Sequence, residues 1–227
     1  KPTGQIDYST GEMLRTPLFY QFCLIFLGSA LAGLMVISCI RLFGIDALQA
    51  GGVVDGAEDP VAAAGVIAGT AMAWYAIFNG LGRILWGTVS DKTGRRKALI
   101  AMCTFQAIMM LLLIKLGATS IGLIVCASVI GFNFGGNFAL FPAATAVYFG
   151  NKNVGRNYGW VFLAYGLAGI VGPLIGGYFK DQAKGLAPTE AVGAWTTPFL
   201  IAAGACFLGA VLAFFIKAPK KAMGEGA

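Results

Sequence analysis

The sequence predicts an all-α membrane protein whose six transmembrane helices form one bundle. Hydrophobic residues make up 58% of the chain, and charged residues make up only 11%. The apolar runs are long enough to cross a hydrocarbon core of about 30 Å as helices. Short polar stretches separate these runs, as in a protein that crosses the membrane several times. A soluble domain of this composition would expose too much apolar surface to water.

Six spanning segments are expected where the long apolar runs lie between polar stretches. They cover residues 17–44, 62–89, 97–116, 119–149, 157–180 and 193–216. The first is preceded by Thr16-Pro17, a pair typical of a helix start. Gly11 to Arg15 suits a short segment on the membrane surface. The predicted domains are a linker and interfacial segment at 1–16, the bundle at 17–217, and a cytoplasmic tail at 218–227.

The distribution of Lys and Arg predicts the orientation of the bundle. Eleven of the sixteen basic residues fall on one side: Lys1, Arg15, Lys92, Arg95, Arg96, Lys97, Lys152, Arg156, Lys217, Lys220 and Lys221. The other side collects Asp46, Asp55, Glu58, Asp59, Asp181 and Glu190, with Arg41, Lys115, Lys180 and Lys184. Because basic loops stay in the cytoplasm, both termini are predicted to be cytoplasmic in a multi-pass protein of the plasma (inner) membrane.

Composition also excludes several function classes. The chain has no histidine, and each of its five cysteines lies in an apolar run with no paired spacing. No metal ligand set, cofactor site or catalytic residue is therefore expected, and the protein is not predicted to be an enzyme. The net charge of +6 arises mainly in short loops, so nucleic acid is not expected as a partner. The chain starts at Lys1 without a visible signal peptide, and we expect a processed or partial start.

A loop motif follows the second apolar run. Residues 87–97 read Gly-Thr-Val-Ser-Asp-Lys-Thr-Gly-Arg-Arg-Lys. This resembles the G-x-x-x-D-[RK]-x-G-R-[RK] loop of the major facilitator superfamily, with matches at Gly87, Asp91, Lys92, Gly94, Arg95 and Arg96. We expect Gly87 to admit a neighbouring helix closely and Asp91 to pair with a basic group or a helix N-terminus. A mere positive-inside loop would explain the basic cluster but not the placement of the glycine and the acid.

Two further segments resemble one branch of this superfamily, the oxalate/formate antiporter family. They run from Gly131 to Pro142 and from Asn157 to Pro173, and they are similar to the tenth and eleventh helices of that family. The resemblance covers nearly the whole chain and implies helices seven to twelve of a twelve-helix transporter. It also implies a second six-helix half as a partner, which is a missing upstream segment, another chain or a second copy.

Arg83 is a basic residue inside an apolar run. It stands two helical turns before Asp91, at a depth where an unpaired guanidinium is costly in lipid. Its planar fork of donors matches a carboxylate bidentately. Two other roles are open, namely snorkelling to the cytoplasmic headgroups or pairing with an acid of the missing half. The resemblance implies substrate binding, because transporters of oxalate, formate and related monocarboxylates place an arginine at this position.

A polar stripe is predicted along the helix that carries Arg83. Tyr75 and Asn79 precede it at intervals of one turn, so the three side chains should face the cavity together. Related monocarboxylate transporters often have an acid where Asn79 stands, and Asn79 cannot titrate. Because no Asp or Glu falls near the middle of any predicted span, a buried carboxylate for proton coupling is not expected in this chain.

Tyr165 departs from the pattern of the family's oxalate carrier, where the resemblance implies a lysine. One cation with a phenol suits a monocarboxylate, or a hydroxy or keto acid, better than a dicarboxylate dianion. Asn133 and Asn137 share one helix face, and we favour helix–helix bonding for the first and lining of the substrate path for the second. Three aromatic residues either wall the path or pack the bundle, with packing favoured: Phe138, Phe141 and Phe162.

Two functional hypotheses follow from these features. The first is secondary active transport of small organic anions, monocarboxylates such as formate and possibly oxalate, by alternating access, with Arg83 as the carboxylate clamp. Its partners would be the lipid bilayer, a small carboxylate and the second half. The alternative is a structural or accessory subunit of a larger membrane complex that does not transport. The chain's length favours the alternative, whereas Arg83 and the loop motif favour the carrier.

Overall fold

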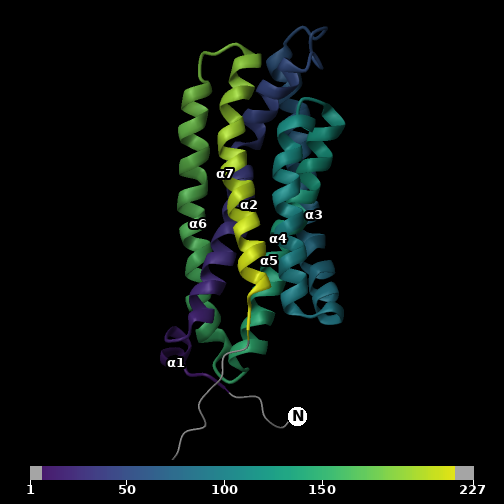
Figure 1. Cartoon of the computed structure of the whole chain (residues 1–227). Coiled ribbons are helices and arrows are strands. Elements are labelled where there is room, and N and C mark those ends of the chain that lie inside the picture. The colour runs from purple at the N-terminus through teal and green to yellow at the C-terminus, as the bar shows by residue number, and fades with distance from the viewer. Residues whose placement is uncertain (1–6, 218–227) are drawn as a thin grey trace, which may run out of the picture.

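The computed structural model describes residues 7–217, and that range contains seven helices and no strand (Figure 1). They are α1 (Thr10–Leu14), α2 (Pro17–Ala50), α3 (Pro60–Thr93), α4 (Arg95–Leu116), α5 (Ser120–Phe149), α6 (Val154–Ala183) and α7 (Pro188–Phe214). The six helices from α2 onward are long and apolar enough to cross a membrane. The predicted all-α membrane fold is confirmed. The predicted tail at 218–227 and the start of the linker at 1–6 lie outside the described residues.

Several helices are longer than predicted because their polar ends stay helical. The apolar pattern predicts an end of the first span at residue 44, but α2 continues to Ala50, and the Gln49 side chain donates to the Ile45 carbonyl at 3.1 Å. Before α3, the Asp59 carboxylate accepts from the Ala62 N–H at 3.0 Å and so caps the helix start. Side-chain caps of this kind satisfy backbone groups that the apolar pattern alone does not account for.

The segment before the first span, expected to lie on the membrane surface, forms the short helix α1. Ser9 and Glu12 make a reciprocal capping box around α1, and Thr16 caps α2 through the Phe19 N–H at 3.3 Å. The chain ahead of α1 is tied to the ends of α5 and α6. The Tyr8 N–H donates to the Phe149 carbonyl at 2.9 Å, and the Asn157 amide donates to the Tyr8 carbonyl at 3.1 Å.

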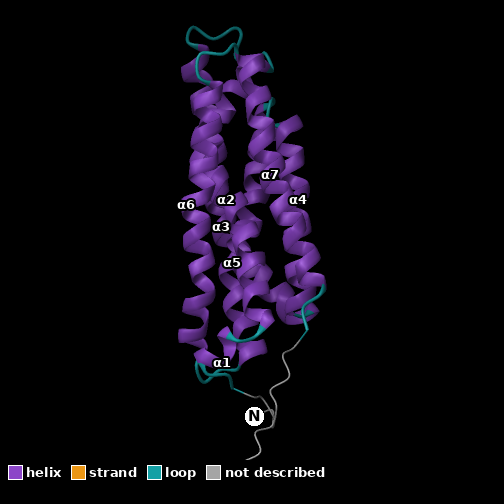
Figure 2. Cartoon of the chain, turned by 60° about the vertical axis from the view of Figure 1, so that its left-hand side comes forward, coloured by secondary structure: helices purple, strands orange, loops and turns teal. Residues whose placement is uncertain are grey.

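The helices run along one axis, with loops only at the two ends of the bundle (Figure 2). The most apolar windows of α2 and α5 are 67% buried, whereas those of α3 and α6 are only 28% buried. Helices α2 and α5 are therefore central, and α3 and α6 present broad open faces. Against this centre, α3 packs on α5 and α6 packs on α2, while α4 and α7 pack on each other.

Glycines bring α3 and α5 into backbone contact. A Cβ atom at Gly82 would lie 2.0 Å from the Phe132 carbonyl oxygen, and one at Gly135 would lie 2.0 Å from the Asn79 carbonyl oxygen. Both distances are far below any real Cβ contact, so no side chain fits at either position. The two glycines therefore allow close packing of α3 on α5. On α6, a Cβ atom added at Gly166 would meet nothing within 4 Å, so this glycine faces open space.

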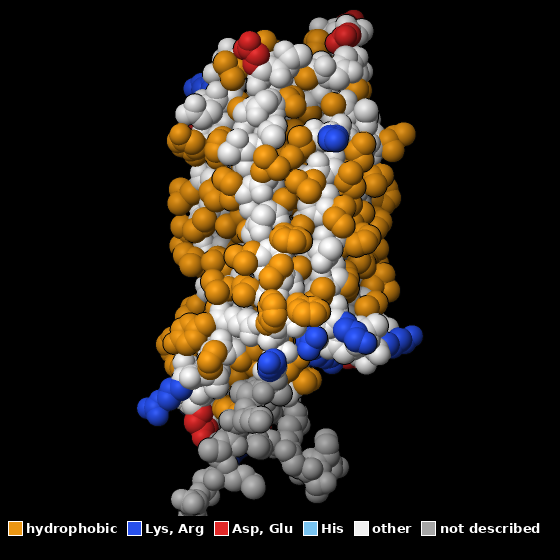
Figure 3. Space-filling model, viewed as in Figure 1, with side chains coloured by type: hydrophobic (Ala, Val, Ile, Leu, Met, Phe, Trp, Pro, Cys, Tyr) orange, Lys and Arg blue, Asp and Glu red, His pale blue; other side chains and the backbone are white. Residues whose placement is uncertain are grey.

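Charged side chains are concentrated at the two ends of an apolar body. In the view of Figure 3, most Lys and Arg side chains gather along the lower end, and most acidic side chains lie at the upper end. The lower end holds the loop after α3, and the upper end holds the loops after α2 and α6 (Figure 1). The orientation predicted from the sequence rests on this distribution of charges, and it places the basic end in the cytoplasm.

A substitution at the α3–α5 crossing tests this packing. Gly82→Ala should destabilise the bundle by about 1–3 kcal/mol, because the added methyl group overlaps the Phe132 carbonyl. Gly80→Ala is a matched control on the same helix, because nothing lies within 4 Å of a Cβ there. Thermal unfolding in detergent should show a lower midpoint for the first variant only. Equal midpoints would mean that the helices do not cross at this distance.

Candidate functional site

Arg83 lies on the open face of α3, where its side chain is exposed. Its guanidinium carbon sits 4.5 Å from the centroid of the Phe138 ring, and Nη2 donates to the Asn79 side-chain oxygen at 3.3 Å. No carboxylate among residues 7–217 lies within ion-pair distance of it. A guanidinium has five N–H donors, so most of this fork is free to bind an anion.

An aromatic cluster from α5 and α6 lies against one side of this cation. The Phe138 ring contacts the Tyr165 ring edge to face at 5.4 Å, and Phe162 stacks on Tyr165 at 4.8 Å. Phe26 of α2 lies behind Tyr165 at 5.9 Å. The Tyr165 hydroxyl has no hydrogen-bond partner among the described residues. Arg83 and Tyr165, predicted as site residues from different helices, thus approach the same phenyl ring.

A cavity lies beside this cluster, between α2 and α3. Its volume is about 250 Å³, and its lining consists of Ile37, Met72, Tyr75, Ala76 and Asn79. Asn79, one turn before Arg83, is both a lining residue of this cavity and a hydrogen-bond partner of the guanidinium. The half-buried Asn79 amide therefore connects the cavity with the cation.

The predicted polar stripe is not a single face. Tyr75 is only 3% exposed, and its hydroxyl donates to the Gly33 carbonyl of α2 at 3.2 Å. Asn79 is half-buried, and Arg83 is exposed. Residues four apart in a helix are offset by about 40°, so two such steps turn the stripe by about 80°. That rotation carries the stripe from the core of the bundle to its open face.

Asn137 is placed in the core rather than along a path. Its side chain is fully buried, and its Oδ1 atom accepts from the Ser29 hydroxyl of α2 at 2.8 Å. Asn133 behaves as favoured, because its Oδ1 atom accepts from the Trp86 indole N–H of α3 at 3.2 Å. The Nδ2 groups of both amides have no partner among the described residues. Phe138, the next residue along, is the one that turns outward.

The three aromatic residues considered as path or packing residues also divide into one core residue and two residues at the open face. Phe141 is fully buried and stacks on Phe26 at 4.1 Å, so it is a packing residue as favoured. Phe138 and Phe162 are half-buried and belong to the cluster at the open face.

The loop motif forms a compact turn between α3 and α4. Asp91 forms an ion pair with Arg95 one turn later, and the same guanidinium donates to the Ser90 hydroxyl at 2.7 Å. Gly94 has φ 90°, a left-handed conformation in which a side chain would be strained. The expected pairing of Asp91 with a basic group is confirmed, and the partner lies within the motif itself. Lys92 and Arg96 are exposed.

Gly87 does not receive a neighbouring helix closely among the described residues. A Cβ atom there would meet the Ala139 Cβ at 3.7 Å, an ordinary van der Waals distance. An alanine would fit at this position, so packing among the described helices does not require a glycine at residue 87.

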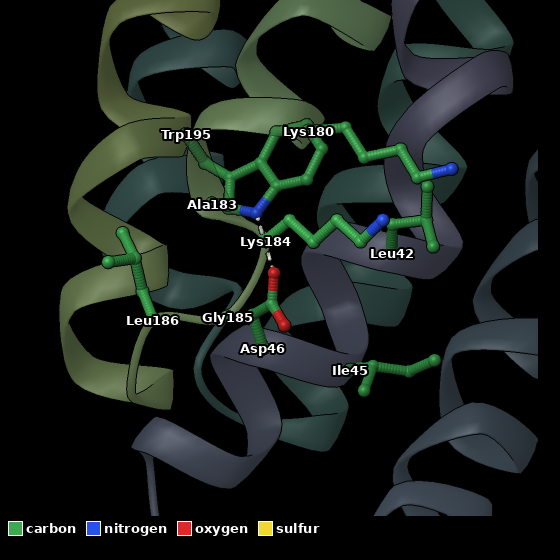
Figure 4. A pocket seen from close by; sticks show the side chains of 9 residues that line it. All are labelled: Leu42, Ile45, Asp46, Lys180, Ala183, Lys184, Gly185, Leu186 and Trp195. Atoms are coloured by element: carbon green, nitrogen blue, oxygen red, sulfur yellow. Dashed lines mark hydrogen bonds between the residues drawn. The ribbon is translucent and has the colours of Figure 1, made fainter.

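A second cavity lies at the opposite end, between α2, α6 and α7, with a volume of about 230 Å³ (Figure 4). The Asp46 carboxylate accepts from the Trp195 indole N–H at 2.8 Å, which ties α2 to α7. The side chains of Lys180 and Lys184 extend across the same space. The sequence places Asp46 among the polar residues of that side. It carries no signal for the bond to Trp195, because the two residues are 149 positions apart.

Comparison with known proteins assigns the family. The chain matches the Major Facilitator Superfamily over residues 18–226. It belongs to that superfamily. It is 32% identical over 92% of its length to an oxalate:formate antiporter of Oxalobacter formigenes, covering 45% of that protein. It is 26% identical over 72% of its length to an uncharacterised MFS-type transporter of Escherichia coli, covering 38%. It is 35% identical over 37% of its length to an apicoplast pyruvate carrier of Toxoplasma gondii, covering 16%.

The chain spans about half the length, or less, of the superfamily relatives it matches. Superfamily membership agrees with the six membrane-spanning helices and with the turn built by Asp91, Gly94 and Arg95. Superfamily membership and the six long apolar helices together identify the chain as a multi-pass membrane protein. Within the described range, the open faces of α3 and α6 stay uncovered by other helices.

Removing the Tyr75 hydroxyl tests its role in the core. Tyr75→Phe should lower the stability of the bundle by up to about 1 kcal/mol, because it removes the hydrogen bond from the Tyr75 hydroxyl to the Gly33 carbonyl that joins α3 to α2. Tyr165→Phe is the control and should leave stability unchanged, because its hydroxyl has no partner in the described chain. Unfolding in a graded denaturing detergent measures both. An unchanged Tyr75→Phe midpoint would show that the bond contributes nothing.

Proposed function

We propose that this chain is the C-terminal six-helix half of a secondary carrier of small organic anions. The carrier would work by rocking this bundle against a second six-helix half around a site near the membrane midplane. The observation that carries the proposal is Arg83, a cation on the open face of the bundle with free donors and no acidic partner among the described residues.

The surroundings of Arg83 suit a carboxylate. Phe138 covers one side of the guanidinium and removes water from it, which strengthens its attraction for an anion. Asn79 holds Nη2 and so restricts the rotation of the fork. A carboxylate could then accept two parallel hydrogen bonds from the remaining donors. The Tyr165 hydroxyl across the Phe138 ring would supply a further donor for a substrate hydroxyl or keto oxygen.

The substrate class follows from the charges that this bundle offers. One cation with a phenol fits a monocarboxylate such as formate, or a hydroxy or keto acid, better than a dianion. The names of two relatives, an oxalate:formate antiporter and a pyruvate carrier, both refer to small carboxylates. Oxalate would need a second cation, which the other half could supply. No side chain in this proposal acts as a nucleophile or base, which agrees with transport rather than catalysis.

In this proposal, four residues have roles at the site, and the bundle has a defined orientation in the membrane. Arg83 is the clamp, Asn79 and Tyr165 are its neighbours, and Tyr75 closes the inner wall of the cavity through its ring. Asn137 is left out because it is buried against Ser29. The basic end of the bundle faces the cytoplasm of an inner (plasma) membrane protein with both termini inside. The turn from Gly87 to Arg96 would contact the second half as the two halves rock.

The alternative is an accessory subunit that keeps the fold without transport. It would have no need for an exposed guanidinium on a helix that is otherwise apolar at this depth, because such a charge is costly in lipid. The free fork of Arg83 therefore favours the carrier. The chain covers only 45% of the oxalate:formate antiporter, and this is compatible with either function, since the second half could come from the same or another chain.

Uptake into proteoliposomes distinguishes the two functions. Radiolabelled formate, lactate and oxalate should enter vesicles that contain this chain together with its native upstream half, and Arg83→Ala should abolish the uptake. The chain alone should show none, because one bundle cannot alternate access. Folded and correctly inserted protein without uptake in either form would favour the accessory subunit.

Arg83→Lys tests bidentate binding. Lysine keeps the charge but loses the planar fork, so formate affinity should fall roughly tenfold to a hundredfold. Arg41→Lys on α2, also exposed, is the matched control and should retain affinity. Binding to the reassembled carrier can be measured by calorimetry. Unchanged affinity in Arg83→Lys would exclude a two-bond contact.

Tyr165→Lys tests the basis of substrate choice. A second cation beside the Phe138 ring should raise the preference for oxalate over formate, because a dianion then gains an ion pair. Competition of the two unlabelled anions against labelled formate measures the ratio. No shift toward oxalate would show that Tyr165 does not select substrate charge.

A further inference from the structure

Helices α4 and α7 pack against each other along a seam on another part of the bundle. None of the side chains in the Arg83 cluster comes from these two helices. The seam holds two cavities in succession, one charged and one apolar. Their order along the helices matches the order of a phospholipid's headgroup and chains.

The first cavity lies at the basic end, with a volume of about 530 Å³. Its lining includes Arg95, Arg96, Lys97, Ile100, Tyr148 and Phe214. Arg95 is occupied by Asp91 and Ser90, but Arg96 and Lys97 have no carboxylate within ion-pair distance among residues 7–217. The Arg96 guanidinium lies 5.4 Å from the ring centroid of Phe214, another lining residue, and this contact keeps it at the cavity. Two cations in one cavity, unpaired within the described part of the chain, provide a site for an anion.

The second cavity continues the seam toward the middle of the bundle, with a volume of about 490 Å³. Thr104, Ile108 and Leu111 of α4 and Leu200, Gly204 and Phe207 of α7 line it. Thr104 is one helical turn, about 6 Å, above Ile100 of the charged cavity. The lining presents almost only carbon, so it suits a hydrocarbon chain and not a soluble anion.

We infer that the α4–α7 seam binds one anionic phospholipid, with its phosphate at Arg96 and Lys97 and an acyl chain in the apolar groove. Charge complementarity selects an anionic headgroup, because Arg96 and Lys97 in this cavity have no carboxylate partner among residues 7–217. The position agrees, because Lys and Arg gather at the lower end of the apolar body (Figure 3), which is the level of the headgroups. This inference does not depend on the proposed transport function, because its readout is lipid binding and not uptake.

The test is a lipid titration of the purified whole chain in detergent, followed by native mass spectrometry. Phosphatidylglycerol should bind more tightly than phosphatidylcholine with the same acyl chains. The pair of substitutions Arg96→Gln and Lys97→Gln should weaken phosphatidylglycerol roughly thirtyfold, since each basic residue near an anionic lipid contributes about 1 kcal/mol. The pair Lys152→Gln and Arg156→Gln is the matched control, because it removes the same charge from another turn at the basic end. Equal losses in both pairs would overturn the site.

The groove is tested separately by filling it. Gly204→Leu should weaken binding of the long-chain lipid, and Gly193→Leu on the same helix but outside the groove should not. A Cβ atom meets nothing within 4 Å at either glycine, so both variants should fold. Equal lipid affinity in the two variants would show that the acyl chain does not lie in the groove. Soluble glycerol 3-phosphate that binds as tightly as the lipid would show a free-anion site and overturn the lipid assignment.

Discussion

The backbone contact between α3 and α5 is the constraint on which the rest of the bundle depends. Gly82 meets the Phe132 carbonyl from one side, while Gly135 meets the Asn79 carbonyl from the other. In lipid, helices gain little from burying apolar surface against one another, so close packing of small residues supplies much of the association. The contact fixes the rotation of α3 about its own axis. Rotation decides which side chains of that helix reach the open face.

The candidate site is a consequence of that fixed rotation. With the Asn79 carbonyl against Gly135, the Asn79 amide is left at the rim of a cavity, and Arg83 emerges one turn later over Phe138. The aromatic cluster then covers one side of the guanidinium while leaving donors free. The proposed carboxylate clamp therefore needs no acid or metal from this bundle. It needs only a cation held between a ring and an amide.

The two ends of the bundle differ in how their charges are used. At the basic end, Arg95 is paired within the turn, while Arg96 and Lys97 remain free, among the described residues, beside a cavity that opens onto the α4–α7 seam. At the other end, Asp46 is bound by Trp195 and holds two helices together. Internal pairing makes a charge structural, and a free charge beside a cavity can bind a ligand. The same distinction separates Arg83 from Asp91.

The sequence by itself determined the fold class, the approximate spans, the loop motif at residues 87–97 and the presence of a costly cation at Arg83. These follow from apolar length, from the spacing of the motif residues and from the cost of a charge in lipid, which are all local properties. Only the tertiary structure decided that Tyr75 and Asn137 turn into the core, where Gly33 and Ser29 bind them. It also decided that Phe138 faces Arg83. Such pairings join residues far apart in the chain, and the register between packed helices, set here by glycine contacts, has no signature in either helix alone.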